Sequence, residues 1–203
     1  MASAHALSSG YVAPRTATGV PNGKLGMWVF LASEVMFFTG LIVAYVVLRM
    51  SNGAAWAGPE GHLSVPLGTL NTLILICSST TIVMALAADA EQKVAALRGW
   101  LLATILLGSA FVAIKVGVEY ASKFAHAIYP STSIFWACYF TITGFHVLHV
   151  LGGIIFNTVV LAYTVNPATW AQQRRRLEWA GLYWHFVDIV WIFLFPMLYL
   201  FSK

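Results

Sequence analysis

Five long apolar stretches constrain this chain more than any other feature of its sequence. A helix needs about 20 apolar residues to cross the hydrocarbon core of a bilayer. The five stretches that meet this length are residues 25–48, 67–88, 99–118, 134–163 and 179–201. Only 9% of the 203 residues are charged, whereas soluble domains carry about a quarter. The sequence therefore predicts an all-α integral membrane protein, a bundle of five transmembrane helices, and excludes a soluble enzyme or a nucleic-acid-binding protein.

The residues outside these stretches predict the domain organisation and the topology. Residues 1–24 are rich in small and polar side chains and predict a flexible N-terminal tail. No loop is long enough to bury a core of its own, so residues 25–203 are expected to form a single five-helix membrane domain. Lys and Arg gather on one side of the predicted membrane, at positions 15, 24, 93, 98 and 174–176. By the positive-inside rule, the N-terminus is cytoplasmic and the C-terminus lies outside.

Glu34 is the first polar group that the predicted membrane interior must accommodate. It lies near the middle of the first stretch, and its neighbours on that helix are Phe30, Leu31, Phe37 and Phe38. Burying an ionisable group at this depth costs free energy, so the group is expected to have a bonding partner or a functional role. Burial also favours its neutral form. Two interpretations stay open: a neutral carboxylic acid that bonds a facing helix, and a proton-exchanging group. We also expect the stripe of this helix that carries Glu34 to pack against a partner protein.

Other polar residues in the stretches are expected to serve packing or local pairing. Lys115 and Glu119 are four residues apart at the outer end of the third stretch, which favours a local ion pair that reaches toward the interface. Asn71 and the hydroxyl run 78–81 lie in the second stretch, where small polar residues allow close helix approach.

Histidines in the last two stretches raise the question of a haem or metal site. His146 and His149 are three residues apart on the fourth helix, and His185 and Asp188 are three apart on the fifth. A two-haem site would need histidine pairs on two facing helices, and a copper site would need three histidines that converge. A single haem remains conceivable. The pattern favours a structural network with polar lipid heads or water, and no metal ligands.

Four segments resemble the signature segments of cytochrome c oxidase subunit III. They are LASEVMFF (31–38), LNTLILICSS (70–79), GFHVLHVLGG (144–153) and YWHFVDIVWIFLF (183–195), in the family's order. KVGVEY (115–120) is similar to the family's helix that ends in Glu-Tyr. The resemblance implies a non-catalytic subunit of a respiratory haem–copper oxidase in the bacterial plasma membrane, which pumps protons as it reduces oxygen. Its partners would be subunits I and II, which carry the haem and copper, and membrane phospholipid.

The resemblance also implies roles for single residues. Glu34 occupies the position of the family's carbodiimide-reactive acid, and Glu178 matches an acid at the start of the last helix. The subunit would support proton uptake and protect the active centre during turnover. Longer members carry two further helices ahead of these five, so a lipid cleft of that form would be incomplete here or closed by another subunit. The alternatives are subunit III of a quinol oxidase, an accessory subunit of nitric oxide reductase and, less favoured, an independent membrane cytochrome or transporter.

Overall fold

The computed structural model describes residues 22–53, 56 and 63–201 as an all-α bundle. Five helical spans are long and apolar enough to cross a membrane, and no strand occurs among the described residues. The spans are α1 (Asn22–Asn52), α2 (Val65–Ala90), α3 and its continuation (Val94–Ala125), α5 (Ile134–Tyr163) and α7 with its continuation (Arg175–Leu200). This confirms the predicted fold class. Most of the predicted tail, residues 1–21, lies outside the described residues, and the orientation of the termini stays a prediction.

Two of the spans change their helical geometry near one end. The third runs as α3 (Val94–Val112), a π-helix η2 (Ala113–Tyr120) and α4 (Ala121–Ala125). The last runs as α7 (Arg175–Phe195) and a π-helix η3 (Pro196–Leu200). A short helix α6 (Pro167–Gln173) joins α5 to α7. The third span therefore continues well past residue 118, where the sequence predicted its end.

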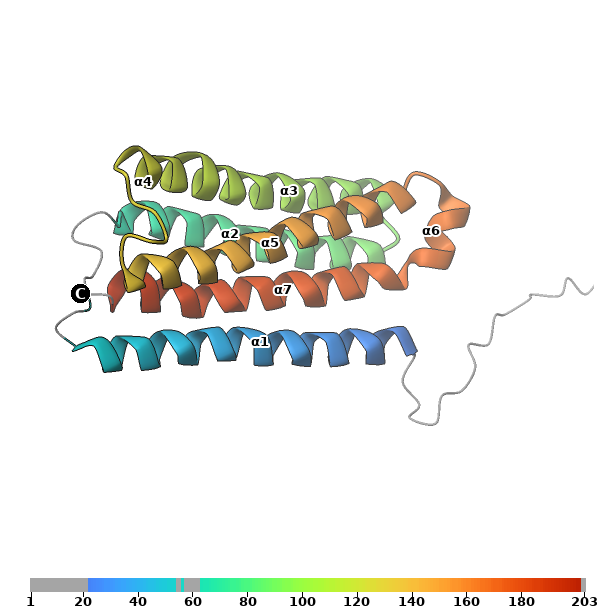
Figure 1. The fold of residues 1–203 in the computed structure, drawn as a ribbon. Helices are drawn as coiled ribbons and strands as arrows, with labels where there is room; N and C mark the ends of the chain where they lie inside the picture. The colour runs from blue at the N-terminus through green and yellow to red at the C-terminus, as the bar shows by residue number, and fades with distance from the viewer. Residues whose placement is uncertain (1–21, 54–55, 57–62, 202–203) are drawn as a thin grey trace, which may run out of the picture.

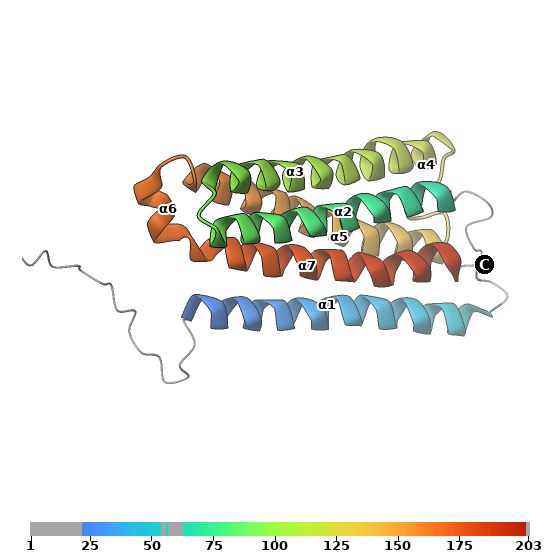
Figure 2. The same cartoon turned by 180° about the vertical axis from the view of Figure 1, so that it is seen from behind.

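Four spans form the body of the bundle, and α1 lies along one edge of it. The helices α2 and α3 pack as an antiparallel pair, and α5 and α7 pack against that pair and against each other. Figures 1 and 2 show α1 beside α7, away from α2 and α3. Only Phe38 and Tyr45 of α1 are buried, and Tyr45 donates a hydrogen bond to the Met197 carbonyl at 3.4 Å.

The edge position of α1 corrects one expectation from the sequence. The stripe that carries Glu34 includes Phe38 and Tyr45, and both are buried against this chain's own core. Phe38 and Tyr45 therefore pack inside the bundle, while Glu34 and Leu41 of the same stripe stay partly exposed, so packing of this stripe against a partner stays a prediction for those two residues. The outer faces of α1 remain open, with Met36 and Met50 76% and 79% exposed, so lipid or a partner subunit must cover them in a membrane.

Glycines let the helices approach closely around Trp184. Its ring is fully buried, and its Nε1 donates a hydrogen bond to Ser78 Oγ at 3.0 Å. A Cβ added at Gly108 on α3 would lie 2.5 Å from this ring, and one added at Gly153 on α5 would lie 2.7 Å from it. Only a residue without a side chain fits at either position. Gly108 and Gly153 therefore set how closely α3 and α5 approach α7, which carries Trp184.

Candidate functional site

Glu34 pairs with a histidine on another helix. On α1 it faces α5, and His149 Nε2 lies 2.9 Å from Glu34 Oε2. The side chains of His149 and Glu34 are 17% and 19% exposed, so the pair lies at the seam between the two helices. The sequence suggested each residue separately but held no signal that joins them, because 115 positions separate them.

The second ring nitrogen of His149 limits how the pair holds its proton. His149 Nδ1 lies 2.7 Å from the Phe145 carbonyl, which can only accept a hydrogen bond, so Nδ1 carries a hydrogen. In a neutral ring Nε2 is then an acceptor, and Glu34 must donate as a carboxylic acid. In the alternative state an imidazolium donates to a carboxylate. Either way, one proton is shared between Nε2 and Oε2.

Aromatic rings surround the pair. The ring of Phe38 lies 5.0 Å from that of His149, centroid to centroid, and the ring of Phe37 lies 6.3 Å away. Tyr183 donates a hydrogen bond to the His149 carbonyl at 3.0 Å and so holds α7 against this turn of α5. Two of the apolar neighbours that the sequence predicted for Glu34, Phe37 and Phe38, thus lie against its partner His149, while the pair itself stays partly exposed at the seam between α1 and α5.

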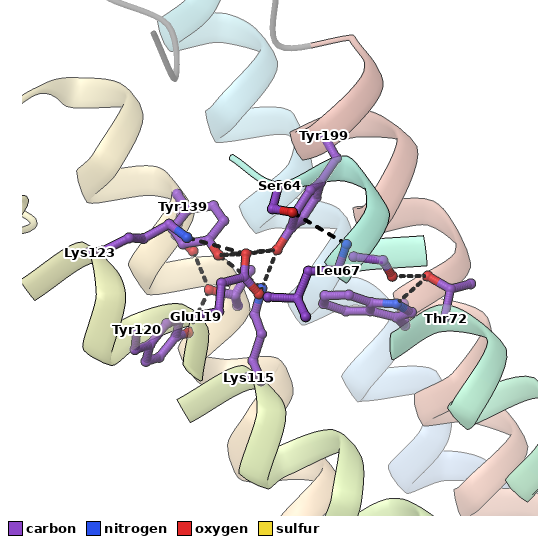
Figure 3. Close-up of polar contacts among 12 residues, drawn as sticks. Ser64, Leu67, Thr72, Lys115, Glu119, Tyr120, Lys123, Tyr139 and Tyr199 are labelled. Atoms are coloured by element: carbon purple, nitrogen blue, oxygen red, sulfur yellow. Dashed lines mark hydrogen bonds and ion pairs between the residues drawn. The ribbon is translucent and has the colours of Figure 1, made fainter. Parts of the chain in front are cut away.

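A second polar group is buried near the other end of the bundle, around Lys115 (Figure 3). Lys115 is fully buried. Its Nζ donates hydrogen bonds to Glu119 Oε2 at 2.9 Å, to Tyr139 at 2.9 Å and to Tyr199 at 2.5 Å. These three bonds use all three hydrogens of an ammonium group. Rings of four residues also lie 4.9–5.8 Å from Nζ, namely Tyr120, Tyr139, Trp191 and Tyr199. These contacts offset part of the cost of burying the ammonium group.

Glu119 joins this group to a second lysine. Its Oε1 accepts hydrogen bonds from Tyr139 at 2.7 Å, from Tyr199 and from Lys123 Nζ at 3.2 Å. The side chains of Glu119 and Lys123 are both 3% exposed. We call Lys115, Glu119, Lys123, Tyr139 and Tyr199 the lysine cluster. It holds two potential positive charges against one negative charge.

The lysine cluster contains the ion pair that the sequence predicted between Lys115 and Glu119, at 2.9 Å. The predicted position of the pair is wrong, because the two residues do not reach toward the interface but are buried among three helical spans. The reason is that the third span continues through η2 to Ala125. A π-helix places more residues in each turn than an α-helix. The stretch of π-helix followed by α4 keeps Lys115, Glu119 and Lys123 on one inward face.

Three other residues singled out by sequence are buried without hydrogen bonds. Within the described residues, neither ring nitrogen of His146 has a partner, and the same holds for the side-chain polar atoms of Asn71 and Asp188. The His146 ring stacks on Trp191 at 5.0 Å, and Trp191 Nε1 donates to Thr72, the neighbour of Asn71. The side-chain amide of Asn157, which no sequence pattern singled out, is also buried without a hydrogen-bond partner among the described residues. Buried polar groups of this kind are normally satisfied by internal water.

The remaining candidates lie apart from both polar groups. His185 Nδ1 lies 2.8 Å from the Ser79 hydroxyl, which ties α7 to α2, and Glu178 is exposed near the start of α7. The single network expected from the sequence is therefore divided into separate contacts. Within the described ranges, no three His, Cys, Asp or Glu side chains come together in a way that would hold a metal ion.

Comparison with known proteins identifies the family. The profile of cytochrome c oxidase subunit III matches residues 6–203. The chain is 37% identical to the probable cytochrome c oxidase subunit 3 of Mycobacterium leprae, over 87% of this chain and 86% of that protein. It is 38% identical to cytochrome c oxidase subunit 3 of Thermostichus vulcanus, over 88% and 87% of the two chains. It is also 32% identical to cytochrome bo(3) ubiquinol oxidase subunit 3 of Pseudomonas putida, over 87% and 84%.

The matched range, residues 6–203, includes all five membrane spans. The chain is therefore a multi-pass plasma-membrane protein that belongs to the cytochrome c oxidase subunit III family of the haem–copper oxidases.

Proposed function

We propose that this chain is the non-catalytic subunit III of an oxidase that takes electrons from cytochrome c. It would bind subunits I and II, which hold the haem and copper, and would hold phospholipid. The observation that carries this proposal is the match to subunit III over residues 6–203. The donor is argued from the 37–38% identity to cytochrome c oxidase relatives, compared with 32% to the quinol oxidase relative.

Purification of the complex tests this assignment. A tagged full-length chain, extracted in mild detergent, is expected to co-purify with a haem-containing subunit and a copper-binding subunit. The preparation should oxidise reduced cytochrome c, while the chain expressed alone should show no haem absorption. Oxidation of quinol without oxidation of cytochrome c would replace the proposed donor. A haem band in the isolated chain that disappears in His146→Ala would contradict the non-catalytic assignment.

Within this role, the Glu34–His149 pair is the candidate for proton exchange. The pair shares one proton at a distance of 2.9 Å inside an aromatic shell. Transfer of this proton between Glu34 Oε2 and His149 Nε2 changes the charge of each residue but not the total charge of the pair. A pair of this kind, partly open at the α1–α5 seam, can take up or release a proton while oxygen is reduced elsewhere. It supports the role in proton uptake that the family resemblance implies.

Glu34→Gln separates proton exchange from a structural hydrogen bond. The Gln amide can still donate to His149 Nε2, so the contact is kept and only the titrating proton is lost. We expect oxygen reduction to continue, with proton release per electron or the lifetime during turnover reduced by less than about tenfold, or about 1.4 kcal/mol. Both are measured in the intact complex at several pH values.

Glu91→Gln is the matched control for this variant, because it removes an exposed carboxylate to which no role is assigned. It should leave proton release and turnover lifetime as in the wild type. If Glu34→Gln also changes neither quantity at any pH, the pair serves structure alone. Complete loss of oxygen reduction in a normally assembled complex would contradict an auxiliary role.

A further inference from the structure

Three buried polar side chains that lack hydrogen-bond partners among the described residues gather around Trp191 of α7. The ring of His146 stacks on the Trp191 ring at 5.0 Å, and neither of its ring nitrogens is bonded. Asn71 is the neighbour of Thr72, which accepts the hydrogen bond of Trp191 Nε1, and Asp188 precedes Trp191 by one turn. Polar atoms that need a partner are thus concentrated around one ring, and internal water is the partner that fits such a place.

His146 lies between the two polar groups of the bundle. It is one turn from His149 on α5, and Thr143 is one turn away in the other direction. Thr143 Oγ1 donates to the Tyr139 carbonyl at 2.6 Å, so it accepts the hydrogen bond of the Tyr120 hydroxyl at 2.6 Å. Residues 139, 143, 146 and 149 are three or four apart and share one face of α5. Each carries a hydroxyl or an imidazole, so groups that can pass a proton follow one another from the lysine cluster to His149.

Trp191 also brings His146 close to the lysine cluster. Lys115 Nζ lies 5.0 Å from the centre of the Trp191 ring, the ring on which His146 stacks. Phe111, one turn before Lys115, meets the His146 ring edge-on at 5.7 Å. Lys115 lies in the π-helix η2, and Tyr199 of the same cluster lies in the π-helix η3. Because π-helical turns are frequent at functional sites, this geometry agrees with a functional role for the cluster.

The depth of Glu34 requires a buried path for its proton. Glu34 is about 18 Å along α1 from Asn22 and about 27 Å from Asn52, so it lies well inside a hydrocarbon core about 30 Å thick. The exposed edge of the Glu34–His149 pair therefore faces lipid or a partner subunit, not bulk water. A proton that enters or leaves the pair needs polar side chains or internal water to carry it.

We propose that His146, with internal water at its ring nitrogens, relays protons between the lysine cluster and the Glu34–His149 pair. Loss of one proton from the cluster leaves one ammonium group against the Glu119 carboxylate, a balanced ion pair. Water passes this proton to the unprotonated nitrogen of His146, whose other nitrogen gives up its own proton toward the pair. The pair takes it up as a Glu34 carboxylic acid beside a His149 imidazolium. The inference rests on the proposed proton exchange at the pair, and it names the route.

Infrared spectroscopy of the intact complex after a pH jump tests the relay. The carboxyl band that is missing in Glu34→Gln reports the protonation of Glu34, and its rate of appearance reports proton delivery. His146→Phe keeps a ring against Trp191 and removes both nitrogens. It should slow the band about a hundredfold, the lower end of the effect of a positioned proton-transfer group, without changing its final size. Asn157→Leu is the matched control, because it removes another unpaired buried side chain from α5, two turns beyond His149, and it should leave the rate unchanged.

His146→Gln separates the imidazole from the water. The Gln amide can still bind water but does not titrate, so this variant should be as slow as His146→Phe. A fast band in His146→Gln would show that water alone carries the proton, and His146 would lose its role. An experimental map of the complex should also show water about 2.7–3.2 Å from a ring nitrogen of His146, and a dry site would contradict the relay.

Two further results would overturn the proposal. One is an unchanged rate in His146→Phe, and the other is an equal slowing in Asn157→Leu. The proposed proton exchange fails in a different way, because the Glu34 band would then not appear at any pH. A band that appears at the wild-type rate in His146→Phe removes the relay alone and leaves the exchange at the pair intact.

Discussion

Replacing Glu119 by Gln is expected to destabilise the folded protein by roughly 3–5 kcal/mol, the cost of removing one partner from a buried ion pair. The carboxylate is the only acidic group in the lysine cluster, and it accepts bonds from both lysines and from Tyr139 and Tyr199. Without it, two ammonium groups remain buried with no counter-charge. The measurement is the free energy of unfolding in mixed micelles, followed by near-ultraviolet circular dichroism.

Lys123→Met tests whether surplus charge is the cause. Lys123 is bonded to the cluster through Glu119, at 3.2 Å, and Met has a similar volume. Its removal leaves a balanced Lys115–Glu119 pair, so stability should stay within about 1 kcal/mol of the wild type, since a buried charge is often replaced by an apolar residue at no cost. Equal losses in Lys123→Met and Glu119→Gln would show that packing, not charge balance, holds these helices.

An exposed acid provides the control for Glu119→Gln. Glu91 lies 2.7 Å from Lys93, with both side chains more than half exposed. The hydrogen bond and the charge of Lys93 lower the pKa of Glu91, but water and salt screen such a surface pair. Glu91→Gln should therefore leave the free energy of unfolding unchanged. A loss there comparable to that of Glu119→Gln would remove burial as the explanation.

Gly153→Ala is expected to destabilise the bundle by about 1–3 kcal/mol, the usual cost of overpacking. The new Cβ would lie 2.7 Å from the Trp184 ring. The ring cannot retreat, because Gly108 abuts it from α3 and its Nε1 is bonded to Ser78. The overlap should outweigh the helix preference for Ala over Gly, which is at most about 1 kcal/mol. The midpoint of thermal unfolding in detergent measures the effect.

Gly144→Ala is the matched control, since it lies on the same helix and its Cβ would meet nothing within 4 Å. It should be neutral or slightly stabilising. Trp184→Phe in the Gly153→Ala background should recover part of the loss, because a smaller ring leaves room for the added Cβ, and the two changes should be non-additive. Equal effects at Gly144 and Gly153 would mean that glycine acts through helix propensity and not through close packing.

The sequence by itself determined the number of spans and placed all but one of their ends to within five residues. Length and apolarity are local properties, and they decide which segments an apolar solvent accepts as helices. The fourth span was predicted at 134–163 and is observed as α5, Ile134–Tyr163. The family followed from short segments, because they are also read locally, and the subunit III profile confirms it. The apolar surroundings of Glu34 followed in the same way from its helical neighbours.

Only the tertiary structure decided where the third span ends and which polar groups meet. The sequence criterion ended that span at residue 118, before the charged Glu119, yet the helix continues to Ala125. It does so because Tyr139 of α5 and Tyr199 of η3 satisfy those charges from other spans. The pairing of Glu34 with His149 arose likewise. Which residues become partners depends on the rotation and depth at which the helices pack. Close approach at residues such as Gly153 sets that rotation and depth. The sequence pattern of a single helix does not contain this information.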